Sequence, residues 1–142
     1  MYELLYSSTA KKDLKEEDIS NILETAREFN LKNNLSGCLV FHNNKFIQIL
    51  EGDEVKVKEL YAKIEKDKRH INVILIHKGL KAERLFKNWT MAYYNLGKID
   101  NNDLQKKIFI ENFITYSEIA DAPTTASKMF WHIAKNLLKE LK

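Results

Sequence analysis

Apolar and polar side chains alternate at the start of the chain, which predicts a strand at 2–7 with Tyr6 on its apolar face. From Asp18, a residue type that caps helices, apolar residues recur every three or four positions as far as Asn30. This spacing predicts a helix. Because Asn30 continues the apolar stripe, the pattern also predicts an amide at a core-facing position.

The dipeptide Asn43-Asn44 separates two further predicted strands, at 38–42 and 45–50. Asparagine tolerates the positive φ angles that a two-residue hairpin requires. Side chains alternate along a strand, so Gln48 shares a face with the apolar residues on either side of it. The pattern therefore predicts a second amide among apolar neighbours.

The rest of the chain predicts a helix at 53–67, strands at 71–77 and 89–94, and helices at about 101–117 and 125–141. Strand segments 46–50 and 73–76 are apolar on both sides, so we expect both faces of the sheet to be covered. We place the first two helices on one face and the last two on the other. The order βαββαββ followed by two helices is an α+β sandwich of ferredoxin-like type, with the first and third strands adjacent at its centre.

Composition and charge narrow the class of protein. The chain has 142 residues, 44% of them hydrophobic, which suits a single domain with a substantial core. Lysine and arginine exceed aspartate and glutamate by only three (23 − 20), and the two signs are interleaved, which is typical of a solvated surface and not of a nucleic-acid footprint. We find no long apolar run and no basic segment leading into one, and we expect a cytoplasmic protein without a membrane segment.

Residue types that often carry chemistry are sparse. Cys38 is the single cysteine and lies in an apolar run, so we interpret it as a buried structural thiol. The four histidines show no metal-ligand spacing, and we expect no metal site. Glu51 has no evident carboxylate partner, and its place at a strand end suggests that it stabilises the start of the next helix and takes no part in acid catalysis.

Tyr6, Asn30 and Gln48 are all predicted to point into the space between the sheet and its first two helices. Burying an amide without a partner costs roughly 1–3 kcal/mol, so these groups must find partners. Two alternatives follow from the residues alone. The three groups bond one another, or they bond a molecule held between them.

Six short segments, in their order and spacing, resemble the BLUF family of FAD photoreceptors over about residues 1–95. They are Leu5-Tyr6-Ser7-Ser8, Ala26-Arg27-Glu28-Phe29-Asn30, Leu35-Ser36-Gly37-Cys38-Leu39, Phe46-Ile47-Gln48-Ile49-Leu50-Glu51-Gly52, Asp67-Lys68-Arg69-His70 and Trp89-Thr90-Met91. Lys63 departs from the arginine common in the family, and Lys68 stands where the family often has proline.

The resemblance implies that the FAD ring lies between the first two helices, with Asn30 and Gln48 bonded to its polar edge and Tyr6 bonded to Gln48. It also implies that the walls around the ring are formed by Ile22, Leu39, Phe46 and Ile64. The residues implied around the ribityl chain and pyrophosphate are Arg27, Lys63, Asp67, Arg69 and His70. The implied photochemical residues are Tyr6, Gln48, Trp89 and Met91.

In BLUF-like proteins, light drives an electron and a proton from the tyrosine to the flavin, and the glutamine then rearranges. Here the change would pass to the strand that carries Trp89 and Met91. We therefore expect residues 1–95 to form a flavin-binding sensor that is not an enzyme. We expect 96–142 to form a helical cap that binds a downstream protein or a second copy of the chain, so that a homo-oligomer is expected.

Two other functions stay open at this point. One is a small flavin-dependent reductase or an acylphosphatase-like hydrolase on the same sandwich, because a fold alone does not determine an activity. The other is an interaction module of the same fold that binds no flavin.

Overall fold

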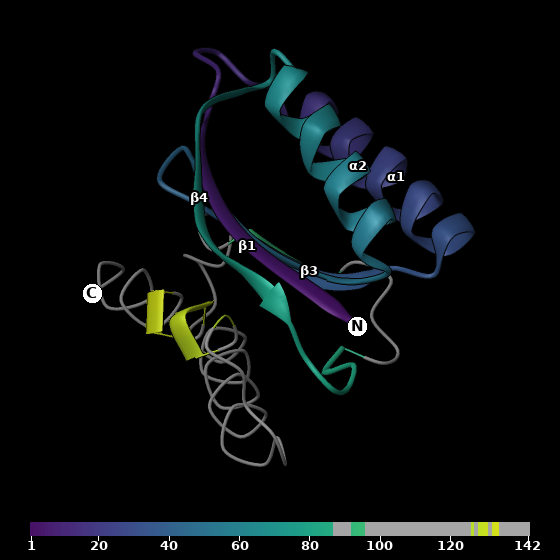
Figure 1. The fold of residues 1–142 in the computed structure, drawn as a ribbon. Coiled ribbons are helices and arrows are strands. Elements are labelled where there is room, and N and C mark those ends of the chain that lie inside the picture. Colours follow the sequence, from purple (N-terminus) through teal and green to yellow (C-terminus); the bar gives the residue numbers. More distant parts are fainter. Residues whose placement is uncertain (87–91, 96–125, 127, 131, 134–142) are drawn as a thin grey trace, which may run out of the picture.

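The computed structural model describes residues 1–86, 92–95, 126, 128–130 and 132–133 (Figure 1). Its elements are β1 (Tyr2–Ala10), α1 (Glu16–Asn33), β2 (Ser36–His42), β3 (Lys45–Gly52), α2 (Glu54–Lys66), β4 (His70–Leu80) and β5 (Ala92–Asn95). This order confirms the predicted βαββαββ arrangement.

One five-stranded sheet, in the order β4-β1-β3-β2-β5, holds the strands together. The first and third strands are adjacent at the centre, as predicted, and they run antiparallel. β5 pairs in parallel with β2 at the edge opposite β4. Figure 1 shows α1 and α2 side by side on one face of the sheet, which confirms the ferredoxin-like sandwich.

Local sequence explains where most of these elements begin and end. Asn43 and Asn44 have φ angles of 50° and 65°, so the hairpin turn forms as predicted. The Asp53 side chain accepts a hydrogen bond from the Lys56 amide at 3.2 Å and caps α2. The N-cap of the first helix is Lys15, three residues before the predicted cap Asp18, which lies inside the helix and accepts from the Lys15 amide at 3.0 Å.

Both faces of the central strands are buried. On the helix side, the core includes Leu4, Phe46 and Leu50 beneath α1 and α2. On the other side, Leu5 and Cys38 are equally buried. Burial raises the pKa of the Cys38 thiol well above its usual value, so the thiol stays neutral and fits the predicted structural role.

Part of the predicted helix at 125–141 is described. Residues 126, 128–130 and 132–133 are helical and lie on the side of the sheet away from α1 and α2 (Figure 1). Within this segment Ala126 and Phe130 are buried. These residues therefore lie on the face where we expected the carboxyl-terminal helices.

The prediction of two covered faces is wrong for β4. Ile74 and Leu75 are exposed, and Leu80 is 76% exposed. β4 lies at an edge of the sheet, and its pairing with β1 shifts register twice. Asn72 takes a left-handed φ of 50° at the second shift. These bulges break the alternation of side chains, which the sequence pattern did not reveal.

The last predicted strand is described at Ala92–Asn95 only. Trp89, Met91 and the predicted helix at 101–117 lie outside the described residues. No helix in the described part of the chain is long and apolar enough to cross a membrane.

Candidate functional site

Tyr6 and Gln48 lie opposite each other on the two central strands. Tyr6 of β1 pairs with Gln48 of β3. Gln48 in turn pairs with Leu39 of β2, the neighbouring strand on the other side of β3. We call these three residues the tyrosine row. Their side chains face α1 and α2, and the Tyr6 hydroxyl donates a hydrogen bond to Gln48 Oε1. The predicted contact between the phenol and the amide is therefore present in the structure.

Tyr6 is a neutral phenol in this environment. Burial, followed by the nearby Tyr61 and Asp67, raises the pKa of its hydroxyl well above the usual value. The Tyr61 ring lies 5.6 Å from the Tyr6 ring, centroid to centroid, at an interplanar angle of 55°. Tyr61 was not among the predicted site residues, although its place on the apolar stripe of the second helix could have indicated it.

A cavity of about 90 Å³ opens beside Tyr6 and Gln48, between α1 and α2. Most of the predicted site residues line it: Tyr6, Ile22, Leu39, Gln48, Lys63, Ile64, Asp67, Arg69 and His70. Sequence reasoning missed four more lining residues, Thr25, Ala26, Phe29 and Leu60. All four lie on α1 or α2, so the facing sides of the two predicted helices contained the signal.

Three predicted residues do not line this cavity. Asn30 is fully buried in the last turns of α1. Phe46 is buried in the core, where its ring lies 4.9 Å from the His70 ring. Arg27 is exposed on α1.

Asp67 and Arg69 form a bidentate pair at the rim of the cavity, just after α2. Arg69 Nη2 lies 2.6 Å from Asp67 Oδ2, and Arg69 Nε lies 2.9 Å from Asp67 Oδ1. Burial alone would raise the pKa of Asp67, but the hydrogen bonds and charge of Arg69 outweigh it and hold that pKa below its usual value. The pair fixes the guanidinium in one orientation.

His70 and Lys63 complete the rim. The His70 ring nitrogen Nδ1 lies 2.8 Å from the Ser8 hydroxyl oxygen. Burial lowers the pKa of His70 below its usual value, against the opposing charge of Asp67. The Lys63 ammonium lies 4.4 Å from the centroid of the Phe29 ring and remains exposed.

The lining fits a flat ring with one polar edge and an anionic tail. Apolar residues form the walls, and the tyrosine row supplies a phenol and an amide. At the rim, Lys63 places an exposed positive charge, and the Arg69 guanidinium lies in its ion pair with Asp67. The space of about 90 Å³ is smaller than the roughly 300–1,000 Å³ typical of ligand pockets. A ring of flavin size therefore requires side chains between α1 and α2 to move apart.

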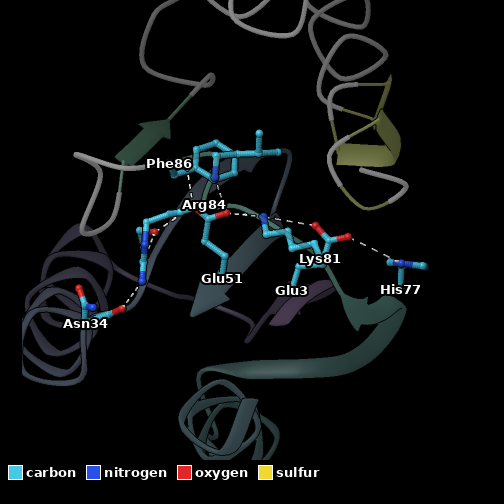
Figure 2. A network of polar contacts seen from close by, with 9 residues as sticks. Glu3, Asn34, Glu51, His77, Lys81, Arg84 and Phe86 are labelled. Carbon is cyan, nitrogen blue, oxygen red and sulfur yellow. Dashed lines mark hydrogen bonds and ion pairs between the residues drawn. The ribbon is translucent and has the colours of Figure 1, made fainter. Parts of the chain in front are cut away.

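Glu51 does not stabilise the start of α2, contrary to the sequence prediction. Its side chain is fully buried on the opposite face of the sheet and binds the chain that follows β4 (Figure 2). Asp53 caps α2 in its place. The prediction was wrong because Glu51 binds Leu85 and Phe86, whose amides lie 34 and 35 residues further along the chain.

Comparison with proteins of known sequence finds light-regulated relatives. The chain is 35% identical over 90 residues to the beta subunit of a photoactivated adenylate cyclase from Euglena longa, which covers 63% of this chain and 10% of that protein. It is 28% identical over 106 residues to the blue light- and temperature-regulated antirepressor BluF of Escherichia coli (strain K12), which covers 75% of this chain and 26% of that protein. The chain thus spans only a minor part of each relative.

Solved structures agree with this relationship. The chain matches BlsA in its photo-activated state with a TM-score of 0.68 and 29% identity, over 96% of this chain and 94% of that one. It matches a bacterial light-regulated adenylyl cyclase with a TM-score of 0.69 and 32% identity, over 82% of this chain and 34% of that one. Residues 1–92 match the family described as sensors of blue-light using FAD, and the chain therefore belongs to the BLUF family of blue-light sensors.

Proposed function

We propose that this chain senses blue light through non-covalently bound FAD held between α1 and α2, and that Tyr6 and Gln48 carry out the response. The hydrogen bond from the Tyr6 hydroxyl to Gln48, in the wall of the cavity between those helices, is the observation that carries this proposal. Membership of a family of flavin-using light sensors supports it.

The residues divide into three groups by what they would hold. Ile22, Leu39 and Ile64 supply apolar walls for the ring. Gln48 and the buried Asn30 supply amides for its polar edge. Arg69, His70 and the exposed Lys63 and Arg27 supply donors and charge for the ribityl chain and pyrophosphate, where a lysine at position 63 offers a point charge without the bidentate fork of an arginine.

When bound, FAD supplies the absorption of blue light and an acceptor for an electron and a proton. Tyr6 keeps its proton in the dark because burial raises its pKa. It can release that proton together with an electron, with Gln48 in direct contact to respond. Rotation of the Gln48 amide swaps the positions of its oxygen and its NH₂ group. Each partner that faced an acceptor then faces a donor, and the reverse. We assign to this rotation the switch between the dark and lit states.

We assign the chain a sensory role and no catalytic one. The relatives include a cyclase subunit and an antirepressor, so their outputs differ while the sensor is shared. We propose that residues after 95 pass the signal to a downstream protein or to a second copy of this chain. We also propose a cytoplasmic location.

A single experiment tests the proposed function. Purified protein is reconstituted with FAD, and its absorption spectrum is taken before and after blue light. We expect a small, reversible red shift of the flavin bands. Bleaching by reduced nicotinamide without such a shift would indicate a reductase, and failure to bind FAD would indicate an interaction module.

A further inference from the structure

A second row of polar side chains crosses the same strands on the face turned away from the cavity. Glu51 of β3 pairs with Glu3 of β1 on one side of the strand and with Ser36 of β2 on the other side. We call these three residues the carboxylate row. Glu51 is three residues after Gln48, so alternation along β3 places the two side chains on opposite faces.

The Glu51 carboxylate is saturated with donors. Its Oε1 accepts hydrogen bonds from the Ser36 hydroxyl at 2.9 Å and from the Phe86 amide. Its Oε2 accepts from the Leu85 amide at 2.9 Å and from the Lys81 ammonium (Figure 2). A carboxylate offers about four lone-pair positions, and four donors occupy them here. Glu51 is therefore fixed in place.

The segment 81–86 contains no helix or strand and is held by side-chain contacts with the sheet. The Lys81 side chain is only 2% exposed, and its ammonium also lies 3.4 Å from the Glu3 carboxylate, so it bridges two buried carboxylates. Arg84 donates to the Ser36 hydroxyl oxygen at 2.7 Å, and also to the Asn34 carbonyl oxygen at 2.8 Å. The position of the segment therefore depends on the carboxylate row.

This segment begins the connection from one edge of the sheet to the other. β4 ends at Leu80 and β5 begins at Ala92 on the opposite edge, so the connection crosses four strand spacings, roughly 19 Å. β3 is the middle strand, and Glu51 holds the connection at Leu85 and Phe86. Phe86 is three residues before Trp89 in the sequence.

We propose that Glu51 is a positioning residue that ties the connection to β3 and passes a change at Gln48 to the chain entering Trp89. The signalling part rests on the function proposed above. Gln48 and Glu51 lie about 10 Å apart along one strand. A displacement of that strand moves the carboxylate, and the amides of Leu85 and Phe86 follow because it holds both.

Hydrogen exchange of the full chain, measured by mass spectrometry over residues 81–92, tests this proposal. The test variant is Glu51→Gln, and Glu3→Gln is its matched control. Each variant neutralises one buried carboxylate that contacts Lys81, but only Glu51 holds the amides of Leu85 and Phe86. A merely structural role predicts similar losses of stability and similar exchange in both variants.

In the dark, and with or without FAD, we expect Glu51→Gln to speed exchange at Leu85 and Phe86 by roughly tenfold over Glu3→Gln. Under blue light, the FAD-loaded parent and Glu3→Gln should change their exchange at these amides. Glu51→Gln should lose that change and keep the red shift of its flavin. Equal exchange in the two variants, or a full light-dependent change in Glu51→Gln, would overturn the proposal.

Two further results are decisive. If the parent shows no red shift, the proposed function fails, while the comparison of the variants in the dark still decides whether Glu51 holds the connection. If Glu51→Gln does not fold, Ser36→Ala replaces it, because this variant keeps Glu51 and removes one donor to its carboxylate, together with the acceptor of the Arg84 hydrogen bond. Exchange at Leu85 and Phe86 that is no faster in Ser36→Ala than in the parent would then overturn the proposal.

Discussion

The tyrosine row and the carboxylate row lie on the same three strands and about three residues apart, yet they are built in opposite ways. The tyrosine row is neutral, joins a phenol to an amide and borders a cavity. The carboxylate row is charged, and every acceptor position of Glu51 is filled. An amide can exchange donor and acceptor by rotation, whereas a saturated carboxylate cannot rearrange without losing bonds. We therefore assign switching to the tyrosine row and rigid connection to the carboxylate row.

The largest expected effect is the loss of the light response in Gln48→Leu. Leucine keeps an apolar shape beside the cavity and removes the amide that rearranges. We expect FAD to bind and the reversible red shift to disappear completely, as measured by absorption under blue light. An undiminished shift would remove Gln48 from the switch and leave the tyrosine row without its assigned role.

Tyr6→Phe should abolish normal photocycling while the protein still folds and binds FAD. Phenylalanine fills the same volume but has no hydroxyl proton and is much harder to oxidise. The lost hydrogen bond to Gln48 should cost on the order of 1 kcal/mol of the free energy of unfolding. Transient spectroscopy and steady illumination check the result. A variant that forms the same red-shifted state with unchanged yield and kinetics would refute the donor role.

The carboxylate row should respond to mutation with lost stability. Lys81→Met removes the cation that bridges Glu3 and Glu51 and leaves both carboxylates buried. Breaking a buried ion pair on one side typically costs 3–5 kcal/mol, so we expect a loss of about 3–5 kcal/mol in urea unfolding. Lys78→Met, an exposed lysine on β4, is the matched control and should change stability little. Equal effects of the two substitutions would contradict the assignment.

The smallest expected effect is a pH dependence at the rim of the cavity. Burial lowers the pKa of His70 below its ordinary value of 6.5. As the pH falls through that value, the unfolded chain binds a proton that the folded chain does not, so the free energy of unfolding decreases. Urea midpoints at about pH 7.5 and about pH 5.5 measure this decrease. His70→Gln should make this decrease in stability smaller. An equal decrease in the variant and the parent would show that other groups cause it.

The sequence was sufficient to predict the tyrosine row because short-range rules determine it. Asn43-Asn44 fixes the hairpin register, and period-two alternation then places Gln48 on the apolar face. The convergence of Tyr6 with Gln48 followed once the first and third strands were placed side by side. The resemblance to a known family supplied what these rules lack, which is the identity of a ligand.

The carboxylate row could not be predicted in the same way. Three of the four partners of Glu51 lie in segment 81–86, which has no periodic pattern, and two of these three are backbone amides that carry no sequence signal. The exposure of β4 was also missed, because the bulge at Asn72 depends on a backbone conformation that asparagine permits and does not require.

The same bulges have a consequence for solubility. An edge strand with exposed residues such as Ile74, Leu75 and Leu80 is a template for pairing with another chain, and flat apolar edges promote aggregation. Two register shifts against β1 increase the local twist of β4, and Lys78 adds a charge to the exposed strand. A second copy would therefore meet an edge that is bent and charged, which disfavours association by continuation of the sheet and keeps the apolar residues of β4 compatible with a dispersed protein.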